Sequence, residues 1–125
     1  EQVIRHPYNY GFLLPLPIQI SVEFISATGL KREGIFRIAP PLTEVTRVVE
    51  YFDSGITVDY HNVKGGVDVA ASVIKLYLRQ LPEPLFTATL YPQFMDLMAD
   101  KKISEDQKLE KLHLLISTKL PELNR

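Results

Sequence analysis

The chain has 125 residues, of which 46% are apolar and 23% charged, and it contains no cysteine. A domain of this length buries about two thirds of the surface that its unfolded chain exposes, so we expect a folded core rather than disorder. The formal net charge of −1 gives no overall attraction to nucleic acid or to anionic lipid. The lack of cysteine excludes disulfides and thiolate chemistry, which suits a reducing compartment, and we expect a cytoplasmic location.

Residues 1–16 predict an irregular lead-in, because proline and glycine interrupt them. We expect the rings of Tyr8, Tyr10 and Phe12 to pack on the domain that follows. The apolar stretch 12–20 contains two prolines and is shorter than the roughly 20 residues of a membrane-spanning helix, so no membrane span is predicted. No export signal is recognisable, and both ends look like domain-excision boundaries.

Residues 17–125 predict a single helical domain. Apolar residues recur at helical spacing, and no segment alternates at period two for long enough to build a sheet, so the expected fold class is all-α. The expected helices are 17–28, a helix capped by Thr43 that ends before Asp53, a helix capped by Asp68 that runs to about residue 80, an amphipathic helix 90–98 with Phe94, Leu97 and Met98 on its apolar face, and a last helix after Ser104 that carries Leu109, Leu112, Ile116 and Leu120.

Several local signals support these boundaries. Pro17 favours a first helical turn and Gly29 a stop. Ser104 and Gln107 have the spacing of a capping box. In the second helix we expect the inward-facing residues to be Val45, Val48, Val49 and Phe52, and in the third helix Ala71, Ile74, Leu78 and Leu81. The stretch between these two helices, 58–67, shows no sustained period and predicts a surface loop.

The usual enzyme motifs are absent from the sequence. It has no Gly-rich phosphate loop, no His-Glu-x-x-His zinc pattern and no Gly-x-Ser-x-Gly elbow. The three histidines, His6, His61 and His113, are far apart and have no partner at ligand spacing, so we predict no metal site.

Arg37 is the residue whose surroundings point most clearly to a function. It lies between large apolar residues in Glu33-Gly34-Ile35-Phe36-Arg37-Ile38-Ala39-Pro40, and Pro40-Pro41 prevents helix there, so we expect it on a loop. We expect the three apolar residues (Ile35, Phe36 and Ile38) to be buried at the core edge, which would let the guanidinium project from a stiffened base. The alternative is an ordinary surface or ion-paired arginine.

Lys75 and Arg79 form a second candidate group. They are four residues apart on the third helix, and therefore on one face. Two cations placed in this way suit an anionic or carbonyl-rich partner, although a solvated helix face has the same appearance.

Three segments carry a resemblance to a known family. The segment 33–38 is similar to the arginine-finger loop of the Rho GTPase-activating (RhoGAP) domain family. Ser72-Val73-Ile74-Lys75-Leu76-Tyr77-Leu78-Arg79-Gln80-Leu81-Pro82-Glu83-Pro84-Leu85 resembles the second signature of that family, and Leu120-Pro121-Glu122-Leu123-Asn124 resembles its Leu-Pro-x-x-Asn stretch. The resemblance covers about residues 9–125, and it implies a multi-helix bundle whose further C-terminal helices are missing from this chain.

The resemblance also implies a function. The domain would bind a Rho- or Rac-type small GTPase in its GTP-bound form and insert Arg37 in trans as a catalytic finger. Lys75 and Arg79 would brace the finger loop and meet the GTPase, and Asn124 would contact it. GTP and Mg²⁺ would belong to the partner, so no cofactor of its own is expected.

Two alternatives remain open at this point. One is a RhoGAP-like module that only binds a GTPase, a lipid or another protein, and the other is a generic helical scaffold. If the missing helices leave core faces exposed, self-association through those faces is a further expectation.

Overall fold

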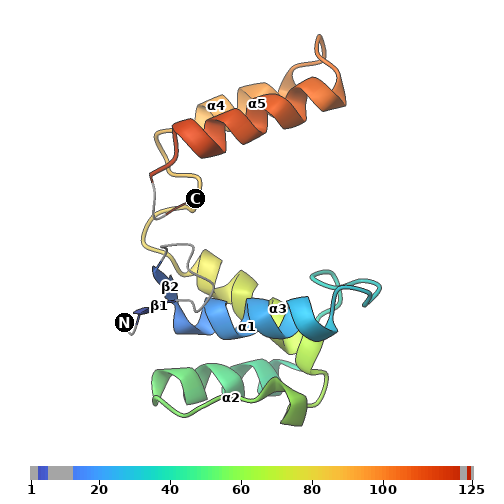
Figure 1. Cartoon of the computed structure of the whole chain (residues 1–125), viewed down its shortest axis with the longest axis vertical. Coiled ribbons are helices and arrows are strands. Elements are labelled where there is room, and N and C mark those ends of the chain that lie inside the picture. The colour runs from blue at the N-terminus through green and yellow to red at the C-terminus, as the bar shows by residue number, and fades with distance from the viewer. Residues whose placement is uncertain (1–2, 6–12, 122–123, 125) are drawn as a thin grey trace. The chain divides into compact units, whose positions relative to one another are not determined.

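The computed structural model describes residues 3–5, 13–121 and 124 of the chain. Within them, helices make up nearly all of the regular structure, which confirms the all-α class (Figure 1). Two compact units divide the chain, residues 1–80 and 81–125. The elements in chain order are β1 (Val3–Arg5), β2 (Leu13–Pro15), α1 (Leu16–Thr28), α2 (Leu42–Asp53), the 3₁₀ turn η1 (Tyr60–Asn62), α3 (Gly66–Arg79), α4 (Tyr91–Ala99) and α5 (Glu105–Thr118).

The start of the chain differs from the irregular lead-in that was expected. β1 and β2 pair as antiparallel strands, with Ile4 opposite Leu14. Each strand has three residues, which is too short for an alternating pattern to be recognised in the sequence. The three rings expected to anchor this segment, those of Tyr8, Tyr10 and Phe12, lie outside the described residues.

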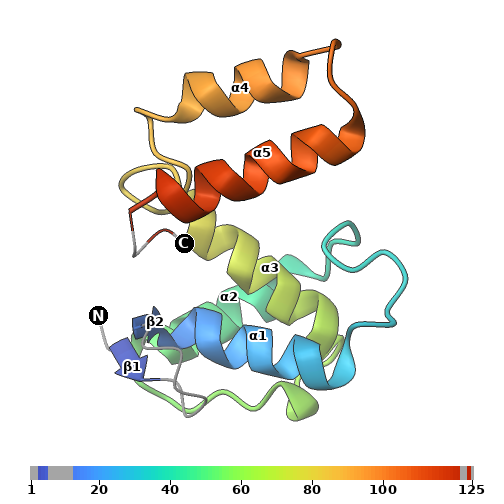
Figure 2. The ribbon, with the colours of Figure 1, turned by 45° about the horizontal axis from the view of Figure 1, so that its top comes forward.

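α1 and α3 lie side by side at the centre of the first unit (Figure 2). α1 has Pro17 in its first turn, where a missing N–H removes no helical hydrogen bond, and it ends at Thr28, directly before Gly29, as predicted. A Cβ on Gly29 would lie 2.8 Å from Cγ1 of Val67. The missing side chain therefore allows the end of α1 to pack closely against the start of α3.

The core of the first unit is formed by α1, α2, α3 and the chain around η1. Its buried members are Ile25, Val45, Val48, Val58, Tyr60, Val69, Ala70, Ala71 and Val73. α2 contributes all four predicted residues, since Val49 and Phe52 pack against this cluster while half-buried. Burying one large aliphatic side chain contributes about 1.5–3 kcal/mol, so this cluster is the main source of the unit's stability.

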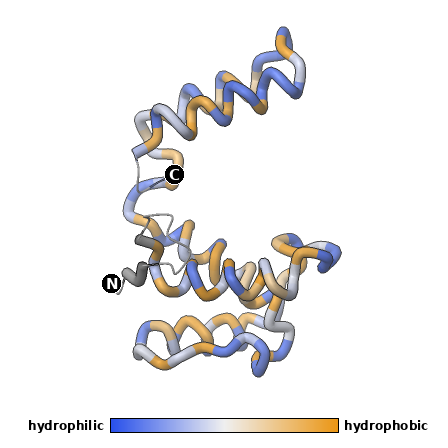
Figure 3. The backbone as a smooth tube through the Cα atoms, viewed as in Figure 1, coloured by the Kyte–Doolittle hydropathy of each residue, from blue (hydrophilic) through white to orange (hydrophobic). Residues whose placement is uncertain are grey.

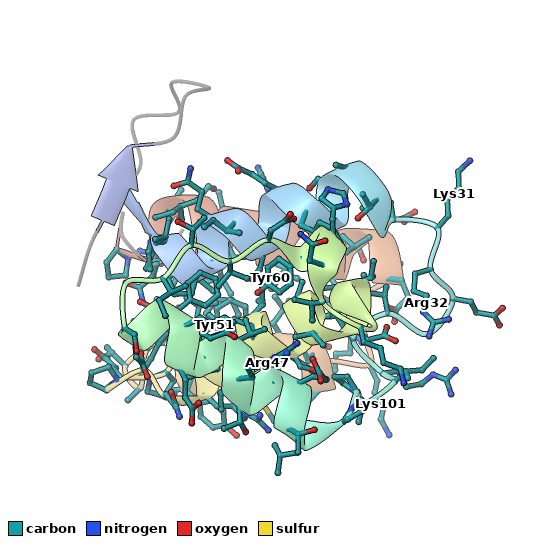
Figure 4. The ribbon with its side chains drawn as sticks, turned by 90° about the horizontal axis from the view of Figure 1, so that it is seen from below. Lys31, Arg32, Arg47, Tyr51, Tyr60 and Lys101 are labelled. Carbon is teal, nitrogen blue, oxygen red and sulfur yellow. The ribbon has the colours of Figure 1, made fainter. Side chains whose placement is uncertain are left out.

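Residues 58–67 match the predicted surface loop only in part, because exposed residues alternate with buried ones along them. Val58 and Tyr60 are buried, and Figure 4 shows Tyr60 among the side chains of the first unit. The hydroxyl of Tyr60 lies 2.7 Å from Oγ of Ser21, to which it is hydrogen-bonded. Burial raises the pKa of Tyr60 to about 12, and the hydrogen bond to Ser21 partly opposes the increase. A Cβ on Gly66 would clash with the carbonyl oxygen of Tyr60, so a glycine is needed where this turn crosses α3.

Two of the predicted helix caps are wrong. α2 begins at Leu42, and no side chain caps it, so Thr43 lies inside the first turn. α3 begins at Gly66, because Gly65 adopts the left-handed conformation (φ 67°) and turns the chain into the helix early. Asp68 consequently lies in the first turn of α3 and not at its cap.

The buried face of α3 is also different from the predicted stripe. Val69, Ala70 and Val73 are buried together with Ala71, whereas Leu78 is 36% exposed. α3 contacts α1, α2 and η1. Its buried residues are nearly consecutive in the N-terminal half, so burial there extends around the helix. An apolar stripe with a spacing of three to four residues predicts burial of one helix face only, so it misses residues buried on the other faces of α3.

The second unit is a hairpin of α4 and α5 (Figure 2). Its core cluster consists of Leu90, Phe94 and Leu120, and the ring of Phe94 stacks on that of Phe86 at a centroid distance of 4.5 Å. The predicted stripe of α4 is correct for Phe94 and Leu97, but Met98 is 55% exposed.

α5 starts as predicted but is packed less than predicted. Oγ of Ser104 accepts from the N–H of Gln107 at 3.2 Å, and Oε1 of Gln107 accepts from the N–H of Ser104 at 2.9 Å, which confirms the capping box. However, no residue of α5 is fully buried, and Leu109 is 63% exposed. Apolar and polar residues are interspersed along α5 (Figure 3).

Candidate functional site

The predicted finger residue, Arg37, lies on the loop between α1 and α2, as the two prolines indicated. The N–H groups of Arg37 and Ile38 both donate to the carbonyl oxygen of Gly34, each at 2.9 Å. Gly34 has a φ of 79°, and a Cβ there would lie 2.8 Å from Cδ1 of Ile38. Glycine is therefore required both for the backbone conformation and for the space inside this turn.

Phe36, directly before the finger residue, adopts a left-handed conformation with a φ of 67°. A bulky residue in this region costs on the order of 1–2 kcal/mol, and such strain persists only where surrounding contacts hold it. The conformation also corrects the prediction of three buried anchors. Ile35 packs against the core, whereas Phe36 and Ile38 are 43% and 36% exposed.

Lys75 supplies a contact that holds this conformation. Its Nζ donates to the carbonyl oxygen of Phe36 at 2.7 Å, across 39 residues of sequence. Lys75 lies in the middle of α3, so a rigid helix fixes the peptide unit that joins Phe36 to Arg37. The structure therefore brings two of the predicted site residues, Arg37 and Lys75, together.

The side chain of Arg37 is exposed, and among the described residues its guanidinium has no hydrogen bond and no ion pair. It passes close to Gly34, since a Cβ there would lie 3.2 Å from Nη2 of Arg37. A guanidinium carries five N–H donors, and here they are available to an external group.

The other two predicted residues are differently placed. Arg79 ends α3, one turn after Lys75, and is exposed. Asn124 belongs to the second unit, where it is half-buried and its Nδ2 donates to the carbonyl oxygen of Leu85 at 2.8 Å. Its amide nitrogen is thus engaged within its own unit.

An ion pair between the loop and α3 was missed by the sequence reasoning. Nη2 of Arg32 lies 2.9 Å from Oδ2 of Asp68, and Nε donates to Oδ1 at 3.4 Å. The hydrogen bond to Asp68, together with its charge, raises the pKa of Arg32 further above its ordinary value. The two residues are 36 positions apart, and nothing in the sequence pairs them.

A groove of about 760 Å³ lies elsewhere on the first unit, between the first turn of α1, the chain after α2 and the end of α3. Its lining includes Ile20, Phe52 and Leu76, and none of the four predicted site residues belongs to it. Within the described ranges, the acidic and histidine side chains form no group of three or more that could hold a metal ion. None of the helices described above has the length and apolar character needed to cross a membrane.

Comparison with known proteins identifies the family. The RhoGAP domain matches residues 15–125. Rho GTPase-activating protein gacY of Dictyostelium discoideum is 36% identical over 125 residues, which are 100% of this chain and 17% of the relative. Human Rho GTPase-activating protein 24 is 34% identical over 109 residues, which cover 86% of this chain and 14% of the relative. The chain thus spans less than a fifth of the length of these two relatives.

A solved structure supports the fold independently. The crystal structure of human Rho GTPase activating protein 15 superimposes with a TM-score of 0.72 at 22% identity, over 88% of this chain and 51% of that chain. At this identity the likeness concerns the fold. With the family match over residues 15–125, it leads to one conclusion: the chain belongs to the RhoGAP domain family.

Proposed function

We propose that this chain accelerates GTP hydrolysis by a Rho-type small GTPase in its GTP-bound form, by placing Arg37 beside the reacting phosphate in trans. The observation that carries the proposal is the exposed guanidinium of Arg37, without a partner among the described residues, on a loop that Lys75 holds at Phe36. The names of the relatives, Rho GTPase-activating proteins, support this class of activity. We expect it in the cytoplasm, with GTP and Mg²⁺ bound by the GTPase.

The proposed chemistry is electrostatic. In phosphoryl transfer, negative charge is spread over the phosphate oxygens and the leaving group, and little covalent chemistry is left for the protein. A guanidinium is always charged and donates in a planar fork, so Arg37 would stabilise two oxygens at once in a water-poor interface. A finger supplied in trans contributes about 10³–10⁵ in rate, which corresponds to roughly 4–7 kcal/mol of activation free energy.

The other residues would act by positioning and binding. Lys75 is engaged with the Phe36 carbonyl, so its proposed role is to orient the finger loop. Arg79 is exposed at the end of α3, and we propose that it attracts an acidic surface of the GTPase. Asn124 donates to Leu85 through its amide nitrogen, which leaves the amide oxygen as the group that would accept from the GTPase.

Single-turnover GTP hydrolysis by several Rho-family GTPases tests the proposal. The wild-type chain should accelerate hydrolysis, and Arg37→Ala should lower the saturating rate by about 10³-fold while the chain still binds the GTPase. Arg79→Ala should instead weaken association, by more at low salt than at high salt. Arg47→Ala is a matched control, because Arg47 is a similarly exposed arginine on α2 that is paired with Glu44.

The outcomes separate the proposal from its alternative. Hydrolysis that is equally fast with wild type and with Arg37→Ala, for every GTPase that binds, would show a module that binds without activating. An unchanged affinity of Arg79→Ala at low salt would remove that residue from the contact surface.

A further inference from the structure

The carboxylate of Asp68 is used in an unusual way for its place in α3. Asp68 is the third residue of the helix, where an acidic side chain ordinarily accepts from free N–H groups of the first turn. Here the two oxygens are directed to Arg32, at 2.9 Å from Nη2 and 3.4 Å from Nε. A contact through two donors fixes the orientation of the arginine as well as its distance.

The two partners of this ion pair differ in burial. The side chain of Asp68 is 11% exposed and that of Arg32 is 46% exposed. A carboxylate removed from water needs a partner, because an unpaired buried charge is strongly unfavourable. Separating Arg32 from Asp68 would leave a buried carboxylate without a counter-charge, so Arg32 is held in place. The more exposed ion pair Arg47–Glu44 lacks this constraint, because water can solvate its charges.

Two clamps from one helix thus hold the loop. Asp68 holds Arg32, five residues before the finger, and Lys75 holds the carbonyl of Phe36, directly before it. Asp68 and Lys75 are two helical turns apart, or about 10 Å along the axis. The loop between the clamped points includes both left-handed residues, Gly34 and Phe36.

We infer that the Arg32–Asp68 pair is a positioning device for Arg37, an inference that rests on the proposed function of that residue. Without this pair, the loop is held at the Phe36 carbonyl and by the packing of Ile35, and the pair adds a second polar contact with α3 that restricts the loop further. A small misplacement of a catalytic group lowers the reaction rate without abolishing binding. Arg32 and Asp68 therefore act on the saturating rate, through Arg37.

The neighbouring residues provide matched controls. Lys31, beside Arg32 on the same loop, is exposed and points away from the first unit (Figure 4). Lys31→Gln removes one positive charge from the loop without touching the clamp. Arg47→Gln breaks an ion pair on α2 whose arginine, at 48%, is about as exposed as Arg32 but whose carboxylate is less buried than Asp68.

Hydrogen exchange of the loop amides tests the clamp without using activity. In the full chain, Arg32→Gln and Asp68→Asn should each speed exchange at the amides of Arg37 and Ile38 by about three- to tenfold. Lys31→Gln and Arg47→Gln should leave these two amides unchanged. If the clamp variants leave them unchanged as well, the inference is wrong, whatever the hydrolysis rates are.

A double-variant cycle in single-turnover hydrolysis tests the path through Arg37. Arg32→Gln alone should lower the saturating rate about three- to tenfold with a half-saturating concentration within about twofold of wild type. Added to Arg37→Ala, it should have no further effect, and Arg32→Lys should recover part of the loss. An equal loss in the Arg37→Ala background would overturn the positioning role. Failure of the proposed function itself is recognised separately, by an Arg37→Ala variant as active as wild type.

Discussion

The two compact units of the chain differ in how much apolar side chain they bury. The first unit has a cluster of nine buried residues shared by four elements, whereas the core cluster of the second consists of Leu90, Phe94 and Leu120. The strained finger loop belongs to the first unit. The left-handed Phe36 is held by Lys75, which belongs to a helix packed in this larger core. The left-handed residue of the second unit, Thr87, is held by local hydrogen bonds instead: its N–H donates to the carbonyl oxygen of Pro84, and its Oγ1 accepts from the N–H of Leu90.

The largest effect that this comparison predicts is for Phe94→Ala. Truncating a buried phenylalanine costs about 3–5 kcal/mol, and few other buried residues are available in the second unit to compensate. We expect the amides of α4 and α5 to lose hydrogen-exchange protection while those of α1 and α3 retain it. Equal loss in both units would mean that they unfold together, and the contrast drawn above would fail.

A smaller effect is expected for Gly34→Ala, which tests the support given to the loop. An alanine would be strained by the positive φ and would contact Ile38, so we expect a destabilisation of about 2 kcal/mol and slower single-turnover hydrolysis. Gly55→Ala is the matched control, since Gly55 has a φ of 71° but no atom within 4 Å of the added Cβ. It should cost about 1 kcal/mol and leave hydrolysis unchanged. Equal effects of both changes on hydrolysis would refute a special role of the Gly34 turn.

The smallest effect is the alkaline pH dependence that the buried Tyr60 gives the first unit. Its pKa is raised from 10.0 to about 12 in the folded chain, so at pH values between these the unfolded state releases a proton that the folded state keeps. Stability is therefore fully present below pH 10 and decreases as the pH rises, by about 1 kcal/mol between pH 10 and pH 11. Urea unfolding of wild type and Tyr60→Phe should differ in this slope. Parallel slopes would show that Tyr60 is not responsible.

Most of the fold was predictable because its helices depend on residues that are close together in the sequence. The helices α1 and α2 and the reciprocal Ser104–Gln107 cap depend on residues within a few positions of each other, and their presence is confirmed. Short strands and glycine-initiated helix starts are less visible. Because Gly65 is left-handed, α3 starts at Gly66, earlier than predicted. Asp68 therefore lies inside the helix and does not form the predicted cap.

The candidate site was predictable only in part, for a similar reason. The nearby prolines predicted that Arg37 lies on a loop. No local feature of the sequence predicts the positive φ of Phe36. The contacts of Lys75 with Phe36 and of Arg32 with Asp68 bridge 39 and 36 residues, and they depend on how α3 docks. Exposure of Phe36 and Ile38 could not be deduced from their hydrophobicity, because the turn at Gly34 decides which way they face.

The contact between Lys75 and Phe36 also has a consequence for the order of events during synthesis. The Phe36 carbonyl leaves the ribosome 39 residues before Lys75, which holds it. The finger loop therefore cannot make this stabilising contact until α3 has formed and docked. The closure entropy of this long loop is overcome only then. Substitutions in α3 that delay docking would consequently appear as a loss of finger function in freshly made protein, although the loop sequence itself is intact.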